Sequence, residues 1–251
     1  MMATTHSPSD ATPPTLHAKG VAAAYSDRII LQGFDLCVRA GEIYALLGAN
    51  GAGKSTALNL FLGFLRPRSG TVRVQGIDPA ADPVKARRQL AYIPENVALY
   101  EHLSARENVA YLLHLAGQEE RDAAIGDALA SAGLDPEAHD RRVGGFSKGM
   151  RQKVSIGLAL ARRVPALLLD EPTSGLDPRA AADFHALLGA LRAKGVAVLM
   201  VTHDLFGAAG IADRIGFLDK GQMAEEVHAA GDERFDIRAL HRRYARLEAA
   251  P

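Results

Sequence analysis

Residues 48–56 read Gly-Ala-Asn-Gly-Ala-Gly-Lys-Ser-Thr and come directly after the apolar run Ile43 to Leu47. The order glycine, four residues, glycine, lysine, then serine or threonine is typical of a loop whose backbone amides surround phosphate groups. Such a loop lies between a buried strand and a helix whose positive end faces the anion. The alternative is an ordinary glycine-rich turn from a strand to a helix. We favour the first interpretation, which predicts a nucleotide triphosphate site.

The residue types in this loop have distinct chemical roles. Glycines let the chain turn through conformations closed to other residues and approach the anion closely. Lys54 would reach the β and γ phosphates, and the hydroxyl of Ser55 would bind Mg²⁺. The predicted nucleotide-binding residues of the loop are Gly48, Asn50, Gly51, Ala52, Gly53, Lys54, Ser55 and Thr56.

The overall composition narrows the class of protein. The chain has 251 residues, enough for one large domain or for one domain with an insertion. Lys plus Arg and Asp plus Glu both number 29, so the formal net charge is zero. The usual electrostatic argument for nucleic-acid binding therefore does not apply, and we expect no nucleic-acid partner.

The cysteine count, the lengths of the apolar stretches and the N-terminal segment indicate the compartment and the relation to membranes that we expect. The single cysteine, Cys37, allows no internal disulfide and indicates a reducing compartment. No apolar stretch approaches the roughly 20 residues of a membrane-spanning helix. Residues 1–14 are rich in Ser, Thr, Pro and Ala and lack the marks of a targeting signal, so we expect a disordered tail.

Hydrophobic patterns predict an α/β fold. The segment from Leu16 to Val38 alternates and predicts two antiparallel strands with one wet face, with Tyr25 in the loop between them. Continuous apolar runs at 43–47, 166–169 and 196–201 are typical of parallel strands that are buried on both faces. These patterns predict a P-loop NTPase core with a mostly parallel sheet, an antiparallel β flank and ligands at the carboxyl ends of the strands.

The pattern between about residues 83 and 163 differs and predicts an inserted, mainly helical subdomain. The segments expected there are helices at about 83–88, 104–115 and 120–132 and a short strand at 90–93. The predicted parts of the chain are the tail at 1–14, a nucleotide-binding domain at 15–230 that contains the insertion, and a C-terminal helical tail at 231–251.

Two carboxylates follow the apolar run at 166–169. Asp170 and Glu171 would lie where a parallel strand ends and the bound phosphate begins. Asp170 is suited to hold Mg²⁺ through water, and Glu171 is suited to orient or deprotonate the water that attacks the γ phosphate. A solvated turn is the better interpretation for an isolated Asp-Glu pair, but not in a chain with a complete phosphate loop.

His203 follows the apolar run at 196–201 and is expected at the same edge of the sheet. It could hydrogen-bond the γ phosphate and sense its presence. An isolated histidine at a strand end is more often structural, but the register of His203 with the other motifs favours function. The predicted catalytic residues are therefore Lys54, Glu171 and His203.

Residues 146–152 read Phe-Ser-Lys-Gly-Met-Arg-Gln and precede apolar residues at helical spacing. Ser147 can cap this helix, so the start of the helix is a second candidate anion-binding end. The alternative is a capped helix with a basic first turn.

Taken together, these motifs resemble the ATP-binding subunits of ABC transporters from about residue 16 to residue 221. The resembling segments are 48–56 (Walker A loop), 146–150 (signature motif), 166–171 (Walker B with its catalytic glutamate), 174–177 (D-loop) and His203 (switch histidine). The resemblance implies a head-to-tail dimer in which the Walker A loop of one copy and the signature motif of the other enclose each ATP. It also implies nucleotide contacts from Tyr25, which would stack on adenine, and from Ser147, Lys148, Gly149 and Asp177.

Two motifs depart from the common pattern of that family. Glu95 follows Tyr92-Ile93-Pro94 where the family commonly has the glutamine of the Mg²⁺-binding Q-loop, and Lys148 stands in Phe-Ser-Lys-Gly where Leu-Ser-Gly-Gly is common. A carboxylate can still bind Mg²⁺ or position a water, so the predicted metal ligands are Ser55, Glu95 and Asp170. Both variants resemble single-domain ATPases that pair with separate exporter-type membrane subunits.

Two further segments bear on partners. Residues 96–103 are more apolar and aromatic than a plain loop needs. By resemblance they line the groove for a short helix of the membrane subunit, and packing against the helical subdomain is an equal alternative. A terminal helix at about 235–248 has an apolar stripe, which favours docking on its own core over binding to a membrane surface.

The resemblance implies an ATPase that uses ATP and Mg²⁺ and pairs with a second copy or a paralogous ABC ATPase. It would drive an integral membrane permease for export from the cytoplasmic face of the inner or plasma membrane. One alternative is a soluble ABC ATPase of an assembly machine that performs no transport. Another is an unrelated small-molecule kinase, which needs an acceptor substrate and has no use for Ser147.

Overall fold

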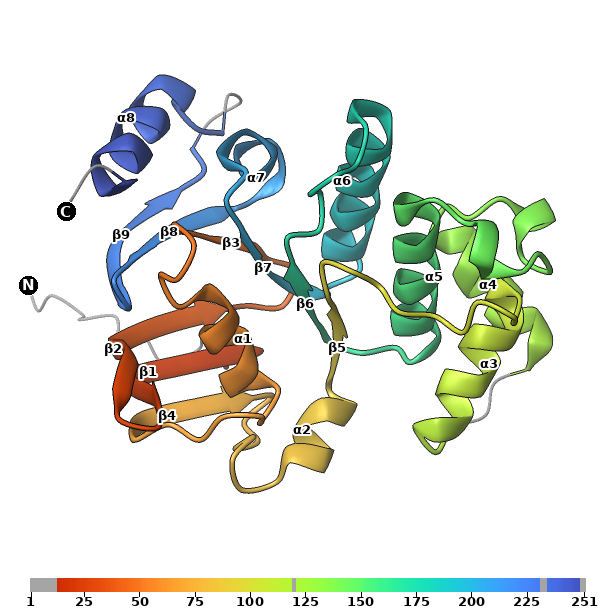
Figure 1. The fold of residues 1–251 in the computed structure, drawn as a ribbon, viewed down its shortest axis with the longest axis horizontal. Helices are drawn as coiled ribbons and strands as arrows, with labels where there is room; N and C mark the ends of the chain where they lie inside the picture. The colour runs from red at the N-terminus through yellow and green to blue at the C-terminus, as the bar shows by residue number, and fades with distance from the viewer. Residues whose placement is uncertain (1–12, 119–120, 231–233, 249–251) are drawn as a thin grey trace, which may run out of the picture.

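The computed structural model describes residues 13–118, 121–230 and 234–248. Most of the predicted tail at 1–14 and both ends of the predicted tail at 231–251 therefore lie outside the described residues. Within the described part, two sheets and the helices around them form the main body, and a group of helices forms a separate lobe (Figure 1).

A six-stranded sheet forms the centre of the main body, with the order β5-β6-β7-β3-β8-β9. The first five strands in this order run parallel, and β9 is antiparallel to β8. The strands are β3 (Ile43–Leu47), β5 (Leu90–Ile93), β6 (Ala166–Asp170), β7 (Ala197–Thr202), β8 (Arg214–Asp219) and β9 (Gln222–His228). The predicted mostly parallel sheet is confirmed.

Strand β3 is made of apolar and aromatic residues because it faces two cores. In β3, Tyr44 and Leu46 pack into the core on one side of the sheet, whereas Ile43, Ala45 and Leu47 pack into the core on the other side. All five residues are fully buried. Side chains alternate between the faces of a strand, so a strand covered on both sides has no position left for a polar residue.

A three-stranded antiparallel sheet with the order β2-β1-β4 forms the predicted flank. Its strands are β1 (Leu16–Tyr25), β2 (Arg28–Val38) and β4 (Ser69–Val74), and helix α1 (Lys54–Phe61) shares a core with it. Tyr25 was predicted in a loop, but it is the last residue of β1 and pairs with Arg28. The chain turns through only two residues, of which Ser26 adopts the left-handed φ of 50° that so tight a turn demands.

Helices cover the opposite face of the six-stranded sheet, and they include α6 (Pro178–Ala193), α7 (Leu205–Ile211) and α8 (Ile237–Glu248). Asp177 caps α6 by accepting a hydrogen bond from the Ala180 amide at 2.9 Å. Phe235 and Leu240 are buried in this core, so the terminal helix docks on its own domain as predicted. Figure 1 shows α8 beside β8 and β9, at the end of the molecule opposite the helical lobe.

The lobe consists of α3 (Ala105–Leu115), α4 (Asp122–Ser131) and α5 (Lys148–Ala161), which share a core of their own. Two segments of the predicted insertion do not belong to it. Strand β5 pairs with β6 in the main sheet, and α2 (Pro83–Arg88) packs Ala86 into the core beneath the antiparallel sheet. We therefore propose that the helical insertion starts after β5. A four-residue strand beside helices carries no local signal of the sheet that it joins.

Among the helices that the structure describes, none combines the length and the apolar character needed to cross a bilayer.

Candidate nucleotide-binding site

The carboxyl ends of three parallel strands bring the predicted motifs together. The phosphate loop joins β3 to α1, the two carboxylates end β6, and His203 follows β7. Leu47 pairs with Thr202, and Asp170 pairs with Val201, so the three strands end at one level. This common edge is where an open α/β sheet binds its ligands.

A cavity of about 420 Å³ lies at this edge. Its volume falls within the range of about 300–1,000 Å³ that is typical of small-molecule sites. Three carboxylates and two cationic side chains lie among its lining residues. These residues are Arg28, Ile30, Ala49, Asn50, Gly51, Gly53, Lys54, Ser55, Thr56, Glu95, Asp170 and Glu171.

Two glycines of the loop are required by its geometry. A Cβ at Gly48 would collide with the carbonyl oxygen of Leu218 and lie 3.1 Å from the Cβ of Ala52. Gly53 has a φ of +112°, where side chains are strained, and a Cβ there would lie 2.7 Å from Leu31 Cδ2. The loop can therefore turn sharply into α1 and leave its backbone open to the cavity.

Lys54 is held inside the loop. Its Nζ donates to the carbonyl oxygens of Gly48 at 2.6 Å and Ala49 at 3.2 Å, and it lies 4.0 Å from Glu171 Oε1. Only 8% of Lys54 is exposed. Burial lowers the pKa of its ammonium group, and the charges of Glu171 and Asp170 oppose that shift. The side chain is thus positioned over the backbone that would surround the phosphates.

Glu171 is fixed by three groups that point at one of its oxygens. Thr202 Oγ1 donates to Oε2 at 3.0 Å, the His203 amide donates at 3.3 Å, and His203 Nδ1 lies 2.9 Å from the same atom. Glu171 itself has a φ of 45°, which is unusual for a residue other than glycine. Strained backbone conformations of this kind cluster at functional sites. His203 does not line the cavity but reaches it through Glu171.

The three predicted metal ligands all line the cavity. Burial raises the pKa of Asp170, while the hydroxyl of Tyr92, which donates to Asp170 Oδ2 at 3.2 Å, lowers it. Burial and the nearby carboxylate raise the pKa of Tyr92 to about 12, so its proton stays available for this bond. Ser55, Glu95 and Asp170 supply only oxygen donors, which suits the preference of Mg²⁺.

Several predicted nucleotide-binding residues do not line the cavity: Gly48 and Ala52 of the loop, Tyr25, and the four residues Ser147, Lys148, Gly149 and Asp177. Ser147 caps α5 by accepting from the Met150 amide at 3.3 Å, and Gly149 follows it in the first turn. Asp177 caps α6, and Lys148 lies 4.0 Å from Glu95 Oε1. The predicted role of these last four residues toward an ATP held by another copy stays a prediction.

Tyr25 also lies outside the cavity lining, with 46% of its surface exposed. Its hydroxyl accepts a hydrogen bond from Asn59 Nδ2 at 2.9 Å, which ties the hairpin to α1. Stacking of this ring on adenine stays a prediction. The lining residues Arg28, Ile30 and Ala49 were not predicted from the sequence. Arg28 could have been predicted from the sequence, because the turn at Ser26-Asp27 is tight and brings the next residue beside Tyr25.

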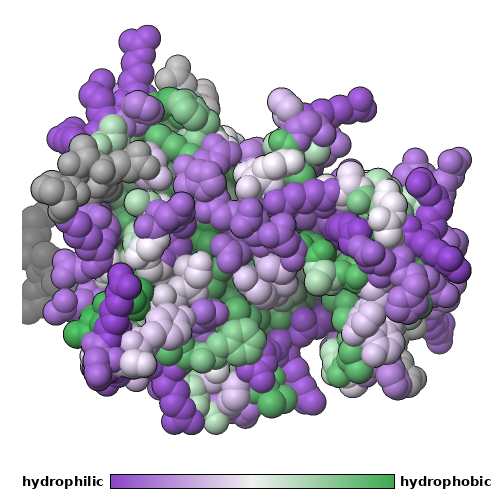
Figure 2. All heavy atoms as spheres, in the orientation of Figure 1, coloured by the Kyte–Doolittle hydropathy of each residue, from purple (hydrophilic) through white to green (hydrophobic). Residues whose placement is uncertain are grey.

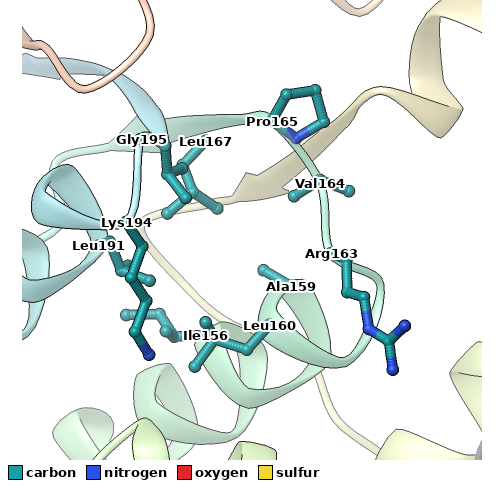
Figure 3. Close-up of a pocket in the computed structure, with 11 residues that line it drawn as sticks. Ile156, Ala159, Leu160, Arg163, Val164, Pro165, Leu167, Leu191, Lys194 and Gly195 are labelled. Carbon is teal, nitrogen blue, oxygen red and sulfur yellow. The ribbon is translucent and has the colours of Figure 1, made fainter.

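A second cavity, of about 460 Å³, lies where α5 ends and β6 begins, at the opposite end of the strands (Figure 3). Most of its lining is apolar, as with Ile156, Leu160 and Leu191, and Arg163 and Lys194 also line it. None of the predicted catalytic, nucleotide-binding or metal-binding residues lines it, although Leu167 of the predicted Walker B segment does. The cavity at the phosphate loop is therefore the candidate nucleotide site.

Comparison with known proteins agrees with this geometry. The ABC transporter family model matches residues 31–174. The uncharacterised ABC transporter ATP-binding protein YdbJ of Bacillus subtilis is 34% identical over 230 residues, which cover 90% of this chain and 73% of YdbJ. The daunorubicin/doxorubicin resistance ATP-binding protein DrrA of Streptomyces peucetius is 36% identical over 222 residues, which cover 86% of this chain and 66% of DrrA.

Solved structures of the cassette MJ0796 from a bacterial ABC transporter are also similar. Its dimeric structure matches with a TM-score of 0.74 and 27% identity, covering 86% of this chain and 99% of that one. Its dimeric post-hydrolysis state with ADP and Pi matches with a TM-score of 0.75. Sequence and structure thus point to one family, and the chain belongs to the ABC transporter family as one of its ATP-binding ATPase subunits.

Proposed function

We propose that this chain binds ATP with Mg²⁺, dimerises head to tail around two nucleotides, and drives an integral membrane permease that exports its substrate. The observation that carries the proposal is the cavity at the carboxyl ends of the strands, where the phosphate loop, Asp170 and Glu171 meet. A fold alone does not fix a function, so the proposal depends on these residues meeting in one cavity.

Glu171 is the proposed base. Its carboxylate lies beside Lys54, which would contact the β and γ phosphates, so a water between Glu171 and the γ phosphate would lie within reach of the carboxylate. Thr202, the His203 amide and the His203 ring hold one oxygen and leave Oε1 toward the phosphate loop. Glu171 would accept a proton from the attacking water, and His203 would link the state of Glu171 to the γ phosphate.

Ser55, Asp170 and Glu95 are the groups that would hold Mg²⁺. When bound, the ion would neutralise charge that develops on the phosphates. Asp170 must be ionised for this, and the hydrogen bond from Tyr92 favours its ionised form.

The dimer of the proposal uses Ser147, Lys148, Gly149 and Asp177 across the interface. Ser147 begins α5, so the positive end of this helix would face the γ phosphate held by the partner copy. The dimeric MJ0796 cassette supports this arrangement in a relative of the same family.

The permease is proposed to bind near the junction of the main body and the helical lobe. Figure 2 shows apolar side chains along this junction. Leu99 packs against the lobe core, whereas Tyr100 and Tyr111 form an edge-to-face pair 5.0 Å apart and are 42% and 41% exposed. Such a patch of exposed aromatic rings suits a docked helix. The chain would then sit at the cytoplasmic face of the membrane through the permease.

Export as the direction follows from the two departures at Glu95 and Lys148 and from DrrA, whose name describes a resistance protein. The transported substrate would contact the permease rather than this chain.

A mixing experiment tests the shared sites. Ser147→Arg and Lys54→Ala each remove one half of both sites in a homodimer, so each variant alone should lose ATP hydrolysis. A mixed dimer keeps one intact site, so a one-to-one mixture should regain roughly a quarter of the wild-type rate. A mixture as inactive as its components would contradict the head-to-tail dimer, and an active Ser147→Arg protein would favour the kinase alternative.

The permease is tested by isolating the tagged chain from detergent-solubilised membranes of its own host. We expect an integral membrane protein in a constant ratio to the chain, and its loss on Tyr100→Asp. Co-purification with soluble proteins only would favour the assembly-machine ATPase.

A further inference from the structure

Two charged residues that depart from the family pattern, Glu95 and Lys148, lie next to each other. Lys148 Nζ is 4.0 Å from Glu95 Oε1. Ser174 Oγ donates to the same carboxylate oxygen at 3.2 Å. The stem of Lys148 passes over Gly175, where an added Cβ would lie 4.0 Å from Lys148 Cδ. Residues that are 53 positions apart in sequence thus form one cluster of opposite charges.

The charge of Glu95 has a consequence for the nucleotide cavity. Glu95 lines that cavity together with Asp170 and Glu171, so three carboxylates face the space where a triphosphate would lie. Only Arg28 and Lys54 supply positive charge among the lining residues. A glutamine at position 95 would leave two carboxylates and the same two cations. The carboxylate at 95 therefore opposes anion binding unless another cation compensates it.

The positive charge of Lys148 lies at the unfavourable end of its helix. Lys148 is the first residue of α5, after the cap Ser147. The N-terminus of a helix carries partial positive charge, so a lysine there is unfavourable, whereas a nearby carboxylate is favourable. Glu95, held at this end by Lys148 and Ser174, supplies that carboxylate.

We infer that Lys148 is a positioning residue for Glu95 of its own chain: it neutralises the extra carboxylate and holds it at the rim of the nucleotide cavity. The inference rests on the proposed ATP site. It differs from the role that Lys148 would have toward the partner copy's nucleotide, because it needs no dimer. The cluster of Glu95, Lys148 and Ser174 also connects the end of β5, the start of α5 and the loop after β6 within one subunit.

A double-mutant cycle with full-length protein tests the pairing. The four proteins are wild type, Glu95→Gln, Lys148→Gln and the double variant, each at a concentration where the chain is monomeric. The measurement is the Kd of a fluorescent ATP analogue with Mg²⁺. The pair is partly exposed, at 47% for Glu95 and 27% for Lys148, so the coupling expected is a factor of about two to five.

Lys148→Gln should weaken nucleotide binding in the wild-type background and have no effect in the Glu95→Gln background. The coupling should shrink at high salt, which a purely steric role would not produce. Lys153→Gln is the matched control, because Lys153 also lies in α5 and pairs with Asp183 at 3.9 Å. It should show no coupling to Glu95. Lys148→Met repeats the cycle if the glutamine variant folds poorly.

Equal effects of Lys148→Gln in both backgrounds would overturn the inference. An unchanged Kd of the monomeric Lys148→Gln protein would also overturn it and would leave Lys148 with a role toward the partner's nucleotide alone. If wild-type protein bound no ATP analogue at all, the proposed function would fail rather than the pairing.

Discussion

Glu171→Gln is the sharpest perturbation of the proposed chemistry, because it removes the proton acceptor and keeps the shape of the side chain. An amide oxygen can still accept the hydrogen bonds from Thr202 Oγ1 and the His203 amide, at 3.0 Å and 3.3 Å in the wild-type protein. What is lost is the negative charge 4.0 Å from Lys54 Nζ and the basic oxygen beside the attacking water.

The two losses differ in size. The contact with Lys54 is long, so nucleotide affinity should change by a factor of less than about five. Loss of a general base typically costs about 10²- to 10⁴-fold in rate, which corresponds to about 2.7–5.4 kcal/mol in the activation free energy. Hydrolysis should therefore fall by at least about 20-fold more than binding, because the smallest expected rate loss is about 10²-fold and the largest expected affinity change is about fivefold.

Single-turnover hydrolysis of ATP and equilibrium binding of the same nucleotide separate these effects. Glu225→Gln is the matched control, because Glu225 pairs with Arg243 away from the cavity and should hydrolyse ATP at the wild-type rate. A Glu171→Gln protein with a rate within about tenfold of wild type would refute the assignment of Glu171 as the base. So would equal losses of binding and hydrolysis, because these would indicate a role in nucleotide binding alone.

Three further changes have expected outcomes. Tyr92→Phe removes a hydrogen bond that lowers the pKa of Asp170, so the pKa of Asp170 should rise further. The acid limb of Mg²⁺-dependent hydrolysis should then move to higher pH. An unshifted pH profile would argue against Asp170 as a metal ligand. Arg214→Met should lower the free energy of unfolding in urea by about 3–5 kcal/mol, because it removes the guanidinium group that pairs with the part-buried carboxylates of Glu42 and Glu226, while folded protein should bind ATP normally. Gly157→Ala places a Cβ 2.9 Å from a leucine side chain of α4 and should lower the free energy of unfolding, measured by thermal unfolding, by about 1–3 kcal/mol. The control Gly210→Ala has open space around the added Cβ and should raise the free energy of unfolding by up to about 1 kcal/mol.

Local signals in the sequence predicted several elements closely. Helix α2 and strands β3 and β5 have the predicted bounds, and α3 starts one residue after its predicted start because Ser104 forms the cap. These elements depend on hydrophobic periodicity and on caps, which act over a few residues. Local signals did not predict which sheet each strand joins. Strand β5 was assigned to the helical insertion because its partner β6 lies more than 70 residues away in sequence.

By itself, the sequence determined the phosphate loop, the two carboxylates after a buried strand and the capped start of α5, because each depends on residue types at short spacing. The tertiary structure decided which of these groups meet. It placed Arg28 in the cavity, joined His203 to Glu171 at 2.9 Å and brought Lys148 to Glu95. Such contacts come from strand order and helix packing, whose energies are summed over the whole core and leave no local trace at the residues that they bring together.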